Sequence, residues 1–151
     1  MENLSYLPNS IGFNEAEWIK LIFLLSDIES RVHEMQKDVF GQLPVSGKNK
    51  LFKKNYYLST GSLAHILERH YYKINRHPGT GKFTVPVTAI LHYIKEAFQL
   101  PVTMHGCGAC LVRSFDTGVE IGIDKNGVPT TVMSILTDSS GIIKTAYPGS
   151  P

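Results

Sequence analysis

The last third of the chain constrains the fold most, because three short turns divide it into segments rich in β-branched residues. Each turn ends in glycine, at residues 116–118 (DTG), 125–127 (KNG) and 139–141 (SSG). Glycine adopts positive φ at little cost, as tight turns between antiparallel strands require. The pattern predicts an antiparallel meander. Its strands are expected at roughly 110–115, 119–124, 129–137 and 141–147, with a further short strand near 101–105.

Helical periodicity dominates the earlier part of the chain. Apolar residues at steps of three and four predict a long amphipathic helix over residues 14–40, and we expect its apolar stripe to belong to the core. A second helix should begin at Ser59 or Thr60 and run through residue 72, and a third should span residues 86–98. Helices followed by strands predict an α+β fold, in which the helices pack on one face of a four- to five-stranded antiparallel meander sheet. The stripe of the first helix consists of Trp18, Leu21, Ile22, Leu25, Ile28, Val32, Met35 and Val39.

Length and composition are those of one domain, residues 1–151, with a core of its own. Cys107 and Cys110 are the only cysteines, which excludes a disulfide scaffold, and their single CxxC pair is a weak signal for zinc. The most apolar stretch, residues 18–28, contains Lys20 and Asp27 and is shorter than the ~20 residues that span a bilayer. We expect a monomer in a cytosolic environment, without a cofactor, a metal or a membrane partner.

Positive charge is concentrated between Lys48 and Lys82. This stretch has eight Lys and Arg residues against Glu68 alone, a local net charge of +7. Cations neutralise phosphates and aromatic rings stack on unpaired bases, so the combination favours RNA or a single strand. The alternative is a solvated surface whose tyrosines belong to the core. The aromatic residues that could stack in this way include Tyr56, Tyr57, Tyr71, Tyr72 and Phe83.

Two histidines of the second helix are candidates for acid–base chemistry. His65 and His70 could exchange protons near neutrality, with Lys82 or Arg69 stabilising negative charge, and such a set needs no metal. Residues 65 and 70 of one continuous helix point roughly 140° apart, however, so both cannot reach one phosphate. On periodicity, His70 faces the sheet. A metal-dependent hydrolase using His65, His70 and His77 is a further alternative.

Four motifs in order carry a family resemblance: LAHILERHYY, GTGKF, VTAILHYIKEAF and the closing VEIGIDKNGVPTTVMSILTDSSGIIKTAYP. Together they resemble C-terminal ribonuclease toxin domains of bacterial polymorphic and contact-dependent inhibition systems, the group that includes barnase, EndoU, colicin E5/D and RelE-like ribonucleases. The resemblance covers residues 58–148. It does not account for the helix over 14–40, which we interpret as an accessory element, or for the MHGCGAC segment (104–110).

The resemblance implies a metal-independent endoribonuclease toxin that cleaves RNA, often tRNA, by attack of the 2′-hydroxyl to give a 2′,3′-cyclic phosphate. It places His65, His70, Lys82, Thr145 and Tyr147 at the catalytic centre, with Arg69 beside them. Thr145 would donate a hydrogen bond to the phosphate and Tyr147 would stack or donate. Strand alternation puts these two on one face, together with Ile143. The basic stretch adds further substrate-binding candidates: Lys73, Arg76, Tyr72 and Phe83.

The same resemblance implies a toxin that acts in the bacterial cytoplasm after delivery as part of a larger protein, and a cognate immunity protein that is acidic where it covers the basic patch. A second hypothesis is a non-catalytic RNA-binding or protein-interaction module on the same fold, which the divergence of His65 and His70 favours.

Overall fold

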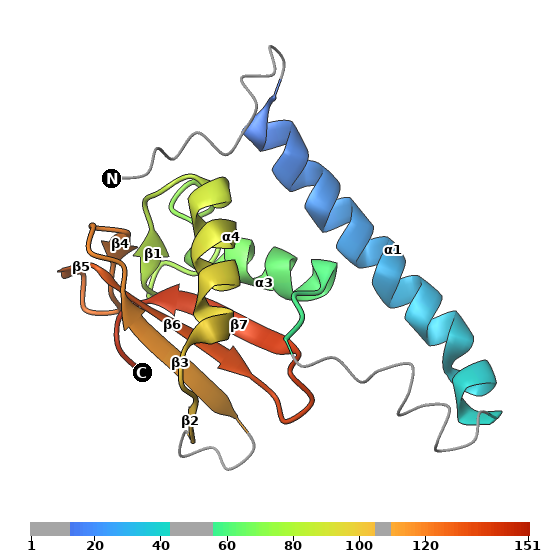
Figure 1. The fold of residues 1–151 in the computed structure, drawn as a ribbon. Coiled ribbons are helices and arrows are strands. Elements are labelled where there is room, and N and C mark those ends of the chain that lie inside the picture. The colour runs from blue at the N-terminus through green and yellow to red at the C-terminus, as the bar shows by residue number, and fades with distance from the viewer. Residues whose placement is uncertain (1–12, 43–55, 105–109) are drawn as a thin grey trace.

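In the computed structural model, which describes residues 13–42, 56–104 and 110–151, the helices lie in the first two thirds of the chain and all but one of the strands follow them (Figure 1). The predicted α+β class is confirmed. The helices of the described part are α1 (Glu15–Gln42), α3 (Thr60–His70) and α4 (Val87–Glu96), followed by the 3-10 turn η1 (Ala97–Gln99). The strands are β1 (Lys82–Phe83), β2 (Thr103–Met104), β3 (Leu111–Asp116), β4 (Gly122–Ile123), β5 (Pro129–Thr130), β6 (Val132–Thr137) and β7 (Ile143–Pro148).

The strands form two antiparallel sheets instead of the single meander that the sequence predicts. The larger sheet has the order β2-β3-β6-β7, and the smaller has the order β1-β4-β5. The predicted strand over 119–124 leaves the meander because its end, β4, pairs with β1. Gly122 permits this approach, since a Cβ there would lie 2.1 Å from the carbonyl oxygen of Lys82. The three turn glycines have positive φ as predicted, at 77°, 79° and 90°.

Helix α3 begins where local sequence predicts and ends slightly earlier. The Oγ of Ser59 accepts a hydrogen bond from the backbone N–H of Ser62 at 3.0 Å, which caps the helix. After His70 the chain becomes extended, and Tyr71 forms a bridge to Phe83 of β1. Pro86 is the N-cap of α4 and not its first helical residue.

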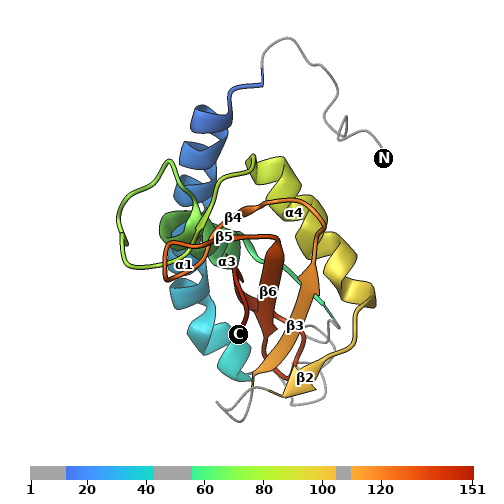
Figure 2. The same cartoon turned by 90° about the vertical axis from the view of Figure 1, so that its left-hand side faces the viewer.

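Helices α3 and α4 lie next to the larger sheet, and α1 lies outside α3 (Figures 1 and 2). Helix α3 contacts strand β7, and α1 contacts α3 from its other side. Helix α4 lies over the larger sheet, as the two views together show (Figures 1 and 2). Core residues from α3, α4 and the strands include Ile66, Leu67, Ile90, Met133 and Ile135, all completely buried.

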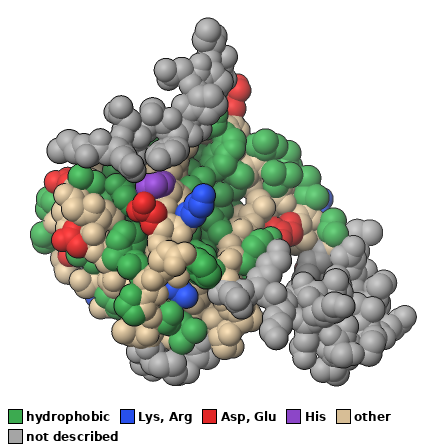
Figure 3. Space-filling model, viewed as in Figure 1, with side chains coloured by type: hydrophobic (Ala, Val, Ile, Leu, Met, Phe, Trp, Pro, Cys, Tyr) green, Lys and Arg blue, Asp and Glu red, His purple; other side chains and the backbone are tan. Residues whose placement is uncertain are grey.

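The prediction that the α1 stripe is core is wrong for most of it. Leu21, Leu25, Ile28 and Val32 are 42–48% exposed, whereas Ile22 and the unpredicted Ile19 are buried. Among the described residues, α1 packs mainly on α3, so only a narrow face of α1 is covered by them. Figure 3 shows hydrophobic side chains gathered at the surface over α1.

Several sequence predictions fall outside the described residues. These concern the side chains of Met35 and Val39, the cations Lys48, Lys50, Lys53 and Lys54, and Cys107. Within the described ranges, none of the helices combines the length and the apolar character that a bilayer-spanning segment needs.

Candidate active site

His70 is the centre of the candidate site. It lies in the last turn of α3, is only 8% exposed, and its Nδ1 is 2.9 Å from the carbonyl oxygen of Gly81. A carbonyl can only accept a hydrogen bond, so Nδ1 carries the proton and Nε2 keeps its lone pair. Burial lowers the pKa of His70 to about 4, with nearby cations acting in the same direction. The imidazole is therefore neutral near pH 7, with a fixed tautomer.

The carbonyl oxygen of Gly81 holds the imidazole of His70 in place. The sequence analysis did not predict a role for Gly81. A Cβ on Gly81 would lie 2.9 Å from the carbonyl oxygen of Ile123 and 3.0 Å from that of Pro148. The backbone that accepts the His70 hydrogen bond is thus packed tightly between the end of β4 and the end of β7. Glycines in the GTGKF motif are typical of a turn, but the motif does not indicate which distant residues would pack on Gly81.

Tyr147 of β7 meets His70 as the resemblance implies. The two ring centroids are 5.8 Å apart and the rings are tilted by 40°. Burial raises the pKa of Tyr147, so the phenol keeps its proton near neutrality. A helix residue and a last-strand residue more than 70 positions apart therefore share one site.

Thr145 lies on the same face of β7 as Tyr147, by strand alternation. Its Oγ1 is buried and has no hydrogen-bond partner within the described part of the chain. Ile143 does not share this face, contrary to prediction. The register of β7 against β6 shifts between Ile143 and Thr145, and Ile143 joins the core together with Ala146.

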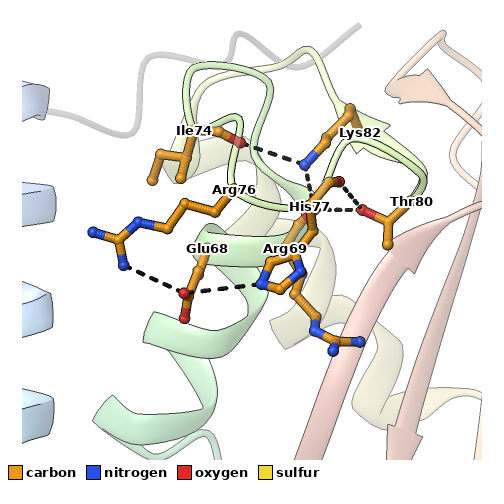
Figure 4. Close-up of polar contacts among 7 residues, drawn as sticks. All are labelled: Glu68, Arg69, Ile74, Arg76, His77, Thr80 and Lys82. Carbon is orange, nitrogen blue, oxygen red and sulfur yellow. Dashed lines mark hydrogen bonds and ion pairs between the residues drawn. The ribbon is translucent and has the colours of Figure 1, made fainter.

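Lys82 lies beneath the end of α3 with 9% exposure. Its Nζ donates to the carbonyl oxygens of Arg69 at 2.5 Å and of Ile74 at 3.4 Å (Figure 4). Burial lowers the pKa of this ammonium group, although its charge still acts on His70. Lys82 therefore ties the end of α3 to the loop that follows, and places a buried positive charge near the imidazole.

Two of the other predicted cations form ion pairs with acidic side chains, and a third does not. Arg76 Nη1 is 3.3 Å from Glu68 Oε1, and Lys73 Nζ is 3.2 Å from Glu15 Oε1. Arg69 has no acidic partner among the described residues, and its guanidinium points away from the Glu68 cluster in Figure 4. Arg69 is thus the cation of this group best placed to meet a phosphate.

The predicted stacking residues differ in exposure. Tyr72 is 47% exposed, so its ring is accessible to a base. The burial of Phe83, at 1% exposure within the core, contradicts the prediction that it stacks on a base. Tyr71 is likewise buried, and its hydroxyl donates to Glu15. The aromatic character of the stretch therefore serves the core as well as the surface.

His65 lies on another face of α3, as the helix geometry requires, although its charge still acts on His70. It lines a hollow of about 460 Å³ between α1 and α3, together with Lys20, Asp27 and Glu68 among others. Burial is the main cause that lowers its pKa. The structure brings together His70, Lys82 and Tyr147, but does not bring His65 to them.

A metal site is not supported by the side chains that the structure describes. Over residues 13–42, 56–104 and 110–151, no group of three or more His, Cys, Asp or Glu side chains is arranged to hold a metal ion. His77 is 3.9 Å from Glu68 and does not join His65 and His70 in such a group.

Comparison of the chain with known proteins gives no match to a family model, to a curated protein or to a solved structure. Function therefore has to be inferred from the geometry of this site.

Proposed function

We propose that the chain is a metal-independent endoribonuclease, of the kind deployed as a toxin in competition between bacteria, with RNA, and tRNA in particular, as its substrate. The observation that supports this most is the state of His70. It is a neutral imidazole with Nδ1 committed to Gly81, and it lies against Tyr147 of the last strand. A general base needs such a fixed tautomer with a free lone pair.

In the proposed reaction, Nε2 of His70 accepts the proton of a ribose 2′-hydroxyl. The 2′-oxygen attacks the adjacent phosphorus, the bond from phosphorus to the 5′-oxygen breaks, and a 2′,3′-cyclic phosphate forms. The departing 5′-oxygen takes a proton, for which Tyr147 and Lys82 are the two candidate donors. Arg69 and the hydroxyl of Thr145, for which the described residues offer no hydrogen-bond partner, would stabilise the charge on the phosphoryl oxygens.

The low pKa of His70 fits this role in the presence of substrate. A base with a pKa of about 4 is deprotonated but weak near pH 7. A phosphodiester bound beside it adds a negative charge, which favours the imidazolium form and raises the pKa toward the working pH. The buried imidazole is then neutral before the proton transfer and stabilised after it.

The test is incubation of purified protein with tRNA and with total RNA in EDTA. We expect cleavage that ends in 2′,3′-cyclic phosphates, measured by mass spectrometry, and its loss in His70→Ala. His92→Ala on α4 is the matched control and should cleave like the unaltered protein. Because His65 lies apart from the site, His65→Ala should retain most activity. An intact RNA pool, or cleavage that survives His70→Ala, would contradict the proposal, and cleavage abolished by EDTA would favour a metal-dependent enzyme.

A second candidate function is an RNA-binding or protein-interaction module without catalysis. Two observations favour it: Lys82 directs its ammonium group at backbone carbonyls, and the exposed apolar stripe of α1 offers a contact surface. Binding of RNA that weakens steeply with salt, with no cleavage, would support this module in place of the enzyme.

The toxin proposal includes delivery into the bacterial cytoplasm as part of a larger protein and a cognate immunity protein. That partner is expected to be acidic where it covers Arg69 and its surroundings. The test is co-expression with the product of the gene directly downstream. Rescue of growth supports the proposal, and toxicity that no neighbouring gene product relieves counts against it.

A further inference from the structure

A second hollow lies directly beside the candidate site. It has a volume of about 260 Å³ and lies between the turn that follows β4 and the C-terminal residues. Tyr147 forms part of its wall, and the same tyrosine ring lies against His70. The lining consists of Asp124, Lys125, Asn126, Thr130, Tyr147, Pro148, Gly149, Ser150 and Pro151.

We propose that this hollow binds one unpaired nucleobase of the RNA, next to the phosphate at which His70 acts. The inference rests on the proposed nuclease function and names where its substrate is recognised. A base held in the hollow would contact Tyr147, and because the ring of Tyr147 lies 5.8 Å from that of His70, the adjoining phosphate would come within reach of the imidazole.

The chemistry of the lining suits a base better than a phosphate. Lys125 is the only cation among the lining residues, and Asp124 brings an opposite charge. Tyr147, Pro148 and Pro151 offer flat apolar surface, and base–aromatic stacking is the usual way in which proteins hold unpaired bases. A small volume in which a few flat apolar surfaces stand beside polar groups, with only two charged side chains, favours a planar ring with polar edges.

Hydrogen-bonding groups are available at the rim for those edges. Oδ1 of Asp124 accepts from the backbone N–H groups of Asn126 at 2.8 Å and Val128 at 3.0 Å, which fixes the turn that presents the Asn126 amide. Thr130 Oγ1 accepts from the N–H of Val132 at 3.1 Å and keeps its own proton to donate. Asn126 and Thr130 can thus distinguish base edges by their donors and acceptors.

The walls are held by the backbone. Gly149, with φ of 116°, packs so closely on Asp124 that an added Cβ would lie 3.1 Å from the Cβ of that residue. The backbone N–H of Gly149 donates to the carbonyl oxygen of Val132 at 2.8 Å, and the carbonyl oxygen of Gly149 accepts from Ser134 Oγ at 2.6 Å. The hollow is therefore preformed, and a base enters it only when it is neither stacked nor paired in a duplex.

The direct test is binding of nucleoside 3′-monophosphates, which the reaction cannot cleave, to the unaltered protein. We expect a titration followed by NMR to shift the side-chain amide resonances of Asn126 and to leave those of Asn75, on the loop after α3, unchanged. Asn126→Ala should weaken binding about five- to tenfold, as expected for the loss of one hydrogen bond, and Asn75→Ala should not. Absence of any shift at Asn126 would overturn the subsite.

A second arm uses cleavage of single-stranded RNA oligonucleotides. Asn126→Ala should raise KM and change base preference with little change in kcat. A substrate that lacks the base beside the scissile bond should be cleaved poorly. If the abasic and intact substrates are cleaved equally, the subsite is wrong although the nuclease proposal holds. If nucleotides bind at Asn126 and no RNA is cleaved, the subsite stands and the nuclease proposal fails.

Discussion

Mild acidification should destabilise the protein through His70. The histidine has a pKa of about 4 when folded and the ordinary value of 6.5 when unfolded. Between these values the unfolded chain binds a proton that the folded protein excludes. Stability therefore rises with pH over this window, and it is lost as pH falls from about 6.5 to about 4.

The magnitude follows from the two pKa values. Their difference corresponds to a loss of about 3 kcal/mol in the free energy of unfolding over the whole window, of which about 2 kcal/mol is lost by pH 5. This is a large part of the ~5–15 kcal/mol by which domains are stable. Asp116, Asp124 and Asp138 have pKa values below the ordinary 3.8, so their contribution is lost at more acidic pH, outside this window.

Urea unfolding at pH 7 and pH 5 measures the effect. In His70→Asn the amide can still donate to Gly81 but does not titrate, so its stability should depend less on pH than that of the unaltered protein. His92→Asn, on α4, is the control and should behave like the unaltered protein. His65 has a lowered pKa as well, so His65→Asn measures its share. An equal loss of stability in His70→Asn and the unaltered protein would refute the reasoning.

Two further predictions concern packing. Gly81→Ala should reduce both stability and RNA cleavage. The added Cβ would lie 2.9 and 3.0 Å from two backbone carbonyl oxygens and would displace the acceptor that holds His70. Unchanged results in both urea unfolding and cleavage assays would disprove this. Ile66→Ala, at a completely buried position, should cost about 2–4 kcal/mol in urea unfolding. Ile28→Ala, at a position 47% exposed, should cost at most about 0.5 kcal/mol. Equal costs at the two positions would show that α1 is covered in solution.

Local features of the fold could be predicted well because each depends on a few neighbouring residues. Ser59 caps α3 through a hydrogen bond to the residue three positions on, and Gly118, Gly127 and Gly141 take the positive φ that their turns require. The burial of His70 also follows from its position on the apolar side of α3.

Pairing over long distances could not be predicted in this way. Strand β4 joins β1 because Gly122 lets two backbones approach, and nothing in residues 119–124 names Lys82 as the partner. The exposure of the α1 stripe could not be predicted for the same reason, because it too depends on contacts between distant segments. Its periodicity indicates an apolar face, but only the packing of α1 on α3 decides which part of that face is covered.

By itself, the sequence determined that helices precede a sheet, where the turns lie, and that His70 faces inward, since propensity and periodicity act within a few residues. The tertiary structure alone decided which groups meet: Gly81 with His70, His70 with Tyr147, and Lys82 with the end of α3. Those contacts join different elements, from 11 positions apart for His70 and Gly81 to more than 70 for His70 and Tyr147, and they form only when the core packs. The chemistry proposed for this protein depends on them.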